Sequence, residues 1–415
     1  MKNFTPIRGT NDYLPRDAKL RELVKEKILT NYQNNGYNLI STPVLEHLEL
    51  LNSSEGGDNL KLMFKTVKRG DKLDLTKPNL TESDIVEEGL RYDLTVPLCR
   101  FYSNNKDKLI LPFKAIQIGN AFRAERPQRG RERQFIQCDI DVIGDPSINA
   151  ELELLKTALD TYVLLGFEDL TVKINSREIL NSIILFSGFN KQDIGTVCVT
   201  LDKIDKISIE GVMMELIEKG FETEKINKLI DIIAETQKSS INCLIKYGVE
   251  DKIIAELNYL INNLVKLTSN KINIVFDISI VRGQGYYTGA VYEIYTNGFA
   301  GAIGGGGRYD NMIEKFSGNK VCAVGVSIGF EPLCMLIKER NISIGSKQNL
   351  ALIYDETNNI IDVYKAKDEL KKQFNVSLFL KPKNMKNFYE KCGEVVDAVI
   401  TYTDYIANKQ VKYLD

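Results

Sequence analysis

The amino-acid sequence predicts an α+β protein with a small α/β domain at its C-terminal end. In the longer, N-terminal part, segments with strand-like alternation of apolar and polar residues stand between segments with helical spacing. Beyond residue 345, short predicted strands and helices alternate, which is typical of an α/β unit. A polar stretch with one glycine at 340–348 separates the two parts, so we expect domains at 1–345 and 346–415.

The first elements are predicted from apolar spacing. Leucine, valine and isoleucine recur at helical spacing between Leu20 and Ile28, which predicts an amphipathic helix at about 17–33. Residues 37–46 are expected to be extended. Residues 74–88 are polar and lack clear periodicity, so we expect a loop with a short helix there.

The central part of the chain predicts strands first and helices later. Residues 90–102 and 113–125 alternate apolar with polar side chains and are expected to form half-buried strands. A helix is predicted at 152–167 and a strand at 170–174. Residues from about 176 to 266 have helical periodicity and few turn residues, so we expect a mostly helical insertion.

The remaining elements are predicted mainly as strands. Strands are expected at 272–280 and 289–295, and the stretch 324–337 predicts a strand, Gly329 and then a helix. Beyond the boundary, the expected order is strand, helix, strand, helix and strand, at 349–355, 360–374, 376–380, 384–391 and 397–402.

The composition excludes several classes of function. The formal net charge of −2 argues against a strongly basic nucleic-acid binder, so any contact with nucleic acid must come from a local basic surface. The first residues lack the apolar core of a signal peptide, and no apolar run could span a bilayer. The seven cysteines are scattered and never form C-x-x-C, which fits a reducing cytoplasm and no zinc site.

The sequence contains one histidine, His47. Serine–histidine–aspartate triads, cysteine–histidine dyads and metal sites with several histidines are therefore excluded. We expect His47 itself to have a plain surface or interface role.

One stretch, residues 122–141 (FRAERPQRGRERQFIQCDID), is unusually rich in arginine. Its central PQRG predicts a turn between two strands. Alternation along the arms would place Arg123 and Glu125 on one face, and Arg131, Arg133 and Phe135 on one face. Such a hairpin could hold a polyphosphate with its guanidiniums and a base with Phe135, although a solvated charged hairpin remains the alternative. The arginines are Arg123, Arg126, Arg129, Arg131 and Arg133.

Two glycine-containing stretches follow, although no P-loop or Rossmann glycine motif occurs. The first, DISIVRGQGYYTGAVYEIY, predicts a hairpin in which Arg282 lies between an apolar strand and a glycine pair that would let a ligand approach the backbone. The second, GAIGGGGRYDNMI, predicts either close approach of backbone to a ligand or a tight turn into a helix that begins near Tyr309.

Together these segments resemble the histidyl-tRNA synthetases, a family of class II aminoacyl-tRNA synthetases, over almost the whole chain. The matching stretches, in chain order, are RGTNDYLP, TPVLE, LRYDLTVP, FRAERPQRGRERQF, VRGQGYYTG, GGGGRYD and VGVSIGFEPL. In the family, TPVLE corresponds to motif 1 at the dimer interface, the arginine-rich stretch to motif 2, and VGVSIGFEPL to motif 3. The order and spacing of these stretches make the resemblance specific.

The resemblance implies a role for each candidate site residue. Arg123 and Arg282 would act in catalysis at the α-phosphate of ATP, and Glu331 would hold Mg²⁺. ATP would be bound by Arg123, Glu125, Arg131, Phe135 and Glu331. Histidine would be bound by Asp93, Thr95, Gln137, Asp141, Arg282, Tyr286 and Tyr287.

The resemblance also implies a fold, an activity and partners. The fold would be an antiparallel sheet with flanking helices, followed by an α/β anticodon-binding domain. The activity would be ATP-dependent formation of histidyl-adenylate and transfer of histidine to tRNA(His), by a cytoplasmic homodimer that needs Mg²⁺ and no membrane.

The chain departs from the family's pattern in three places. Pro332 stands where motif 3 has an arginine over the adenine, Gly285 replaces an aspartate in RGQGYY, and the last domain is short. Two alternatives therefore stay open. One is a histidine-sensing regulatory subunit of ATP phosphoribosyltransferase, and the other is a paralogue that activates histidine without tRNA.

Overall fold

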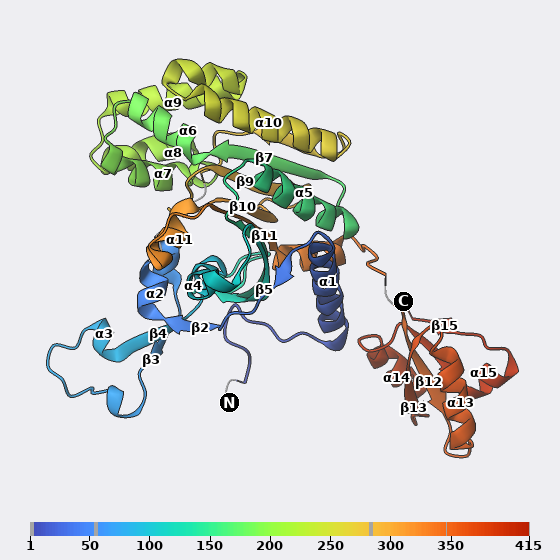
Figure 1. Cartoon of the computed structure of the whole chain (residues 1–415). Helices are drawn as coiled ribbons and strands as arrows, with labels where there is room; N and C mark the ends of the chain where they lie inside the picture. Colours follow the sequence, from blue (N-terminus) through green and yellow to red (C-terminus); the bar gives the residue numbers. More distant parts are fainter. Residues whose placement is uncertain (1–3, 54–56, 282–284, 346, 415) are drawn as a thin grey trace. The chain divides into compact units, whose positions relative to one another are not determined.

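The structure is a computed structural model that describes residues 4–53, 57–281, 285–345 and 347–414 (Figure 1). It divides into two compact units. The larger unit consists of Met1–Thr10 and Lys27–Ile342, and the smaller unit of Asn11–Glu26 and Ser343–Asp415.

The larger unit is built on a mainly antiparallel sheet. Its strands are β1 (Asn38–Leu39), β5 (Phe113–Phe122), β6 (Gln134–Ile143), β7 (Leu170–Ser176), β8 (Asn273–Phe276), β9 (Ala290–Thr296), β10 (Gly304–Arg308) and β11 (Ala323–Gly329). Within the described residues their order is β1-β5-β6-β11-β10-β9-β7-β8, and only the outer pairs β1–β5 and β7–β8 are parallel. The expected antiparallel sheet is confirmed.

Helices flank this sheet. They are α4 (Thr95–Asn105), α5 (Asn149–Leu164), α6 (Arg177–Phe186), α7 (Ile194–Leu201), α8 (Ile204–Glu218), α9 (Thr223–Lys238), α10 (Asp251–Leu267), α11 (Asp310–Ser317) and α12 (Phe330–Glu339). Helix α5 packs on β6 and β11, and α12 packs on β6. Helices α6 to α10 gather beside the β7 end of the sheet (Figure 1).

A second, three-stranded sheet in the order β2-β4-β3 lies within the larger unit. Its elements are β2 (Leu45–His47), α2 (Leu48–Ser53), β3 (Lys65–Val67), α3 (Glu82–Ile85) and β4 (Val86–Leu90). The short helix expected between residues 74 and 88 is therefore α3. Short 3₁₀ helices complete the larger unit at η1 (Gly57–Leu62), η2 (Gly70–Lys72), η3 (Lys106–Lys108), η4 (Lys191–Asp193) and η5 (Ile241–Tyr247).

The strand predicted at residues 90–102 is wrong, because helix α4 occupies most of that segment. Buried side chains recur every third position from Val96, which is helical and not strand-like spacing. The Asp93 carboxylate accepts the backbone N–H of Val96 at 3.2 Å and so satisfies one of the free donors at the start of the helix. Pro97 sits in the first turn, where its missing N–H costs little.

The four glycines at 304–307 form strand β10 in the middle of the sheet, so the tight turn expected as one alternative is not formed. The reason is close packing across the sheet. A Cβ at Gly306 would lie 2.0 Å from the Gly325 carbonyl oxygen, and one at Gly304 would lie 2.4 Å from the Tyr162 hydroxyl oxygen. Helix α11 then begins next to Tyr309, as predicted.

The smaller unit contains a mixed four-stranded sheet in the order β13-β12-β14-β15. Its elements are β12 (Asn349–Tyr354), α13 (Ile360–Leu370), β13 (Asn375–Leu380), α14 (Met385–Cys392), β14 (Ala398–Thr401), α15 (Tyr402–Ala407) and β15 (Lys412–Tyr413). Helix α1 (Pro15–Asn34) contains residues of both units. Leu350 and Leu352 pack on one side of β12 and Ala351 and Ile353 on the other, so this small sheet has a core on each face.

Among the described helices we find no candidate membrane span, since none combines the necessary length with the necessary hydropathy.

A buried ion pair ties β10 to α5. The Arg308 guanidinium donates to both Glu151 carboxylate oxygens, at 2.7 Å from Nε and 2.6 Å from Nη2. It also donates to the backbone carbonyls of Asp145 and Ser147. Glu151 is fully buried, so its charge depends on this one guanidinium for compensation.

Replacing Arg308 by Met should therefore lower the free energy of unfolding of the larger unit by about 3–5 kcal/mol, because it leaves Glu151 buried without a partner. Urea denaturation followed by circular dichroism measures this loss. The double variant Arg308→Met/Glu151→Leu should recover most of it, since both polar groups are then removed.

The matched control is Lys156→Ala, which breaks the partly exposed pair between Lys156 and Asp160 on the same helix α5. Its cost should stay below about 1 kcal/mol. An Arg308→Met variant that loses no more stability than Lys156→Ala would contradict the role given to the buried pair.

Candidate functional site

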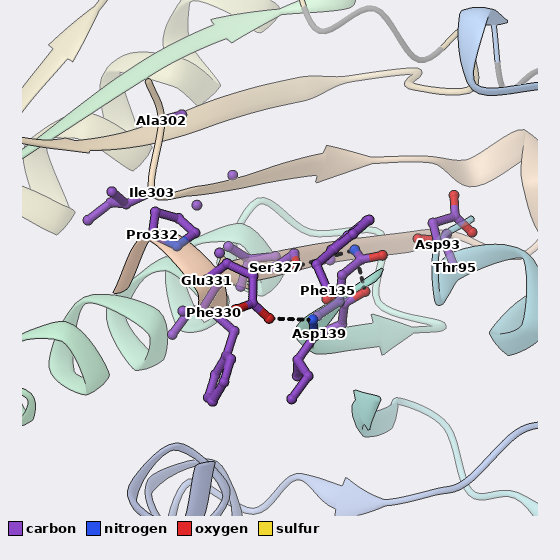
Figure 2. A pocket seen from close by; sticks show the side chains of 18 of the residues that line it. Asp93, Thr95, Phe135, Asp139, Ala302, Ile303, Ser327, Phe330, Glu331 and Pro332 are labelled. Carbon is purple, nitrogen blue, oxygen red and sulfur yellow. Dashed lines mark hydrogen bonds between the residues drawn. The ribbon is translucent and has the colours of Figure 1, made fainter. Parts of the chain in front are cut away.

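A cavity of about 370 Å³ lies against the central strands β6, β10 and β11 (Figure 2). Figure 2 shows Asp93 and Thr95 toward one end of it and Pro332 and Ile303 toward the other. The predicted site residues that line it are Asp93, Thr95, Arg123, Glu125, Arg131, Phe135, Gln137, Asp141, Tyr286, Tyr287 and Glu331. The remaining candidate, Arg282, lies outside the described residues.

Strand pairing creates the floor of the cavity. Side chains alternate along a strand, so Gln137, Asp139 and Asp141 on β6 share one face. The neighbouring strand β11 places Ser327 beside Asp139 and Gly325 beside Asp141. A Cβ at Gly325 would lie 2.0 Å from the Asp141 Oδ1 atom, so only glycine leaves room for that carboxylate.

Acceptor atoms without partners collect in this cavity. Asp93 Oδ2, Gln137 Oε1, Asp139 Oδ1 and Asp141 Oδ2 are buried and have no hydrogen-bond partner within the described residues. Unsatisfied buried acceptors cost free energy unless a donor reaches them. The arrangement therefore suits a ligand that carries positive charge and several N–H donors.

Burial also changes the protonation of the three carboxyl groups. Burial raises the pKa of Asp141 to about 7, the nearby charge of Asp93 adds to this rise, and the hydrogen bond from Tyr309 opposes it. Burial, with the charge of Asp141, holds the pKa of Asp139 well above its usual range. Burial likewise raises the pKa of Asp93, against the lowering effects of the Val96 N–H and Arg123.

Tyrosines close one side of the cavity. The Tyr309 hydroxyl donates to Asp141 Oδ1 at 2.6 Å and fixes the orientation of that carboxylate. The rings of Tyr286 and Tyr287 lie 4.8 Å apart between their centroids, and both line the cavity. Bare backbone at Gly307 makes room for Tyr287, because a Cβ there would lie 2.9 Å from the Tyr287 ring.

The arginine-rich stretch is a hairpin, as the sequence predicts. Strands β5 and β6 pair antiparallel up to Phe122 and Gln134, and a single bridge joins Gln128 to Arg131 near the tip. The Arg123 guanidinium donates from Nε to the Tyr92 carbonyl at 3.0 Å and lies 5.1 Å from the centroid of the Phe135 ring.

The hairpin divides its arginines between two environments. Arg123 and the exposed Arg131 line the cavity. Arg129 instead pairs with Glu339 at 2.5 Å, on α12. Arg126 and Arg133 are also absent from the cavity lining, so only part of the arginine cluster faces the site.

Glu331 contributes a carboxylate at the start of helix α12. Its Oε1 atom accepts the backbone N–H of Ile136 at 3.1 Å, the contact drawn as a dashed line in Figure 2. Among the residues that the structure describes, no group of three or more His, Cys, Asp or Glu side chains is arranged to hold a metal by itself. A metal here would need oxygen ligands from a bound substrate.

The rim near Pro332 is apolar. A Cβ at Gly130 would lie 3.3 Å from Pro332 Cβ and 2.9 Å from Phe299 Cζ, so these three residues are in close contact. Where the resemblance leads one to expect an arginine, the chain has Pro332. The Arg129 guanidinium lies 5.8 Å from the centroid of the neighbouring Phe299 ring.

The sequence analysis missed several lining residues. Asp139, Glu293, Ser327 and Tyr309 all line the cavity. Asp139 could have been predicted from the sequence, because it lies two residues from both Gln137 and Asp141 on a predicted strand. The other three reach the site only through the order of strands in the sheet, which alternation alone does not give.

The raised pKa of Asp141 predicts a pH dependence of stability. An unfolded aspartate titrates near pH 4, so between that value and about 7 the folded chain holds a proton that the unfolded chain has lost. The contribution of Asp141 to the free energy of unfolding is therefore fully present below about pH 4 and is lost as the pH rises through about 7. Replacing Asp141 by Asn should make the free energy of unfolding fall less steeply over this range, as measured by urea denaturation of the ligand-free protein.

Asp71→Asn is the matched control, since Asp71 is exposed and lies outside the cavity. Its pH profile should follow that of the unchanged chain. An Asp141→Asn profile that does the same would refute the assigned titration.

Comparison with known proteins agrees with this geometry. The family model for histidyl-tRNA synthetase matches residues 9–333. A histidine–tRNA ligase from Leifsonia xyli is 39% identical over 85% of this chain and 84% of its own length. One from Clostridium tetani is 35% identical over 81% and 75%.

Solved structures share the fold. A histidyl-tRNA synthetase from Nostoc aligns with a TM-score of 0.74 at 23% identity, covering 98% of this chain and 94% of its own. A protein from Bacillus halodurans, described as an ATP phosphoribosyltransferase regulatory subunit/histidyl-tRNA synthetase, also aligns with a TM-score of 0.74, at 20% identity over 96% and 98%. From the span of the family model and the identity to its relatives, the chain belongs to the histidyl-tRNA synthetase family.

Proposed function

We propose that the chain is a histidine–tRNA ligase, which activates histidine with ATP and transfers it to tRNA(His). The observation that carries this proposal is the placement of two chemically different surfaces in one cavity. Buried acceptors on β6 suit a cationic, donor-rich amino acid, and the arginines of the hairpin suit a polyphosphate. Relatives at 35–39% identity carry the same name.

Histidine recognition would use the acceptor-rich end. An imidazole N–H can donate to Asp141, whose orientation Tyr309 fixes, and Tyr287 would meet the ring from the other side. The α-ammonium group would be held by Asp93, Thr95 and the amide oxygen of Gln137. An amino acid without these donors would leave the acceptors buried and unpaired, which is how such a site discriminates strongly.

ATP recognition would use the hairpin end. Arg131 would hold the outer phosphates, Phe135 would stack on the adenine and Glu125 would accept from its amino group. Pro332, which lines the cavity, would then cover the base by apolar contact.

Activation needs no titrating protein group. The carboxylate of histidine attacks the α-phosphorus in line, the bond to the bridging oxygen breaks, and pyrophosphate leaves. Negative charge develops on the phosphate oxygens, and Arg123 is placed to stabilise it. We assign the same task to Arg282, which lies outside the described residues.

Mg²⁺ fits this site only together with ATP. Mg²⁺ in such enzymes is held by one or two carboxylates and by substrate phosphates. Glu331 supplies one carboxylate beside the proposed phosphate path, which is compatible with that pattern. The ion would neutralise charge on the phosphates, while the chain's own arginines orient them.

The remaining partners follow from the activity. The tRNA acceptor end would reach the adenylate, and the smaller unit would contact the anticodon arm through some of its lysines. The candidate lysines are Lys365, Lys367, Lys371, Lys372, Lys381, Lys383 and Lys386. A homodimer built through residues 42–46 and a cytoplasmic location complete the proposal.

Histidine-dependent exchange of pyrophosphate into ATP tests the proposal, because it isolates activation from tRNA. The purified chain with Mg²⁺ should catalyse exchange with histidine and not with the other amino acids. Replacing Arg123 by Ala should lower kcat/KM by at least roughly 30-fold, equivalent to about 2 kcal/mol of lost transition-state stabilisation.

Arg126→Ala is the matched control, since Arg126 lies on the same hairpin but is exposed and absent from the cavity lining. It should retain near-normal exchange. Histidine binding without any exchange would instead support the regulatory-subunit alternative, in which Pro332 and Gly285 mark a site that no longer activates its ligand.

A further inference from the structure

One arginine of the hairpin supports the site without lining it. The backbone carbonyl of Arg133 accepts the N–H of Arg123 at 2.9 Å. Its side chain donates from Nε to the carbonyl of Glu125 at 3.0 Å. Arg133 thus fixes the backbone at two residues that line the cavity, while its own side chain is absent from the lining.

Arg133 is itself held by a segment from the start of the chain. The carbonyl of Gly9 accepts the N–H of Arg133 at 2.7 Å and, more weakly, that of Gln134 at 3.4 Å. These bonds continue the hydrogen bonding of the hairpin beyond the last paired residues of β5 and β6. The N-terminal segment therefore contacts the hairpin between its last paired residues and its tip.

The segment from Ile7 to Thr10, here called the strap, has a defined conformation. Both the backbone N–H and the hydroxyl of Thr10 donate to the Ile7 carbonyl, at 2.9 Å and 2.7 Å, which closes a four-residue turn. Gly9 occupies the third position of this turn with φ +87°, where type II turns favour glycine.

Gly9 also leaves no room for a side chain. A Cβ there would lie 2.7 Å from Pro127 Cγ and 2.8 Å from Arg133 Cγ. The strap therefore packs closely against the hairpin on both sides of the hairpin's turn. Conformation and contact both restrict this position to glycine.

We propose that the strap positions the phosphate-binding hairpin, and that Gly9 and Arg133 are positioning residues for the ATP site. What the hairpin binds rests on the proposed function. Between Phe122 and Gln134 the hairpin extends beyond the ladder of β5 and β6, and a two-stranded hairpin without further sheet neighbours is weakly ordered. With the strap in place, Arg123 and Arg131 are held ready for a polyphosphate, so binding does not have to order them.

The test is the variant Gly9→Ala, which changes no side chain of the hairpin. Any loss of ATP affinity then reflects position and not lost charge. Gly36→Ala is the matched control: Gly36 has φ +83°, so the backbone penalty is similar, but no atom lies within 4 Å of a Cβ there. Arg133→Met serves as a second variant if Gly9→Ala does not fold, because it removes the donor to Glu125 and keeps an apolar stem.

Two readouts separate positioning from general damage. In pyrophosphate exchange, Gly9→Ala should raise KM for ATP roughly tenfold, the cost of ordering one to two side chains, and leave KM for histidine within about twofold. Amide hydrogen exchange of residues 122–134 should be faster in Gly9→Ala than in Gly36→Ala, with other segments alike.

The outcomes are distinguishable. Hairpin exchange and KM for ATP equal to those of Gly36→Ala would overturn the inference, as would a parallel rise in KM for both substrates. If the unchanged chain shows no histidine-dependent activity, the proposed function fails. Hydrogen exchange still decides on the strap in that case, because it needs no substrate.

Discussion

The site depends on the alternation of side chains along β6, a strand in the interior of the large sheet. Once β5 and β11 pair with its two edges, Phe135, Gln137, Asp139 and Asp141 must all face the same side. Glycines and a serine on β10 and β11 leave space above that face. The cavity, its row of acceptors and its connection to the arginine hairpin all follow from this one strand and its neighbours.

In this arrangement, the buried carboxyl groups that would recognise a ligand also destabilise the ligand-free folded chain. Burial raises the pKa values of Asp93, Asp139 and Asp141, and neighbouring aspartate charges raise those of Asp139 and Asp141 further, which weakens the folded state without ligand. The rest of the larger unit offsets this cost with apolar packing on both sides of the sheet. A ligand that supplies donors would satisfy the acceptors and stabilise the fold, whereas a ligand without them would not.

Local patterns in the sequence predict part of the fold and of the site, and they fail to predict the rest for physical reasons. The hairpin follows from two alternating arms around PQRG, and several of the residues on it that line the cavity are predicted, although Asp139 is not. The strand prediction at residues 90–102 was wrong because Pro97 and the capping Asp93 favour a helix, and the alternation of apolar and polar residues does not reveal either effect. The glycine strand and the role of Arg133 depend on which backbone lies alongside, and that is decided by tertiary packing.

The most direct test of the proposal that this cavity binds histidine and ATP is a crystal structure of the chain with L-histidine and a non-hydrolysable ATP analogue. We expect the imidazole to lie against Asp141, the ammonium group among Asp93, Thr95 and Gln137, and the phosphates on Arg123 and Arg131. Histidine bound outside this cavity, or bound with its carboxylate facing the aspartates of β6, would contradict it.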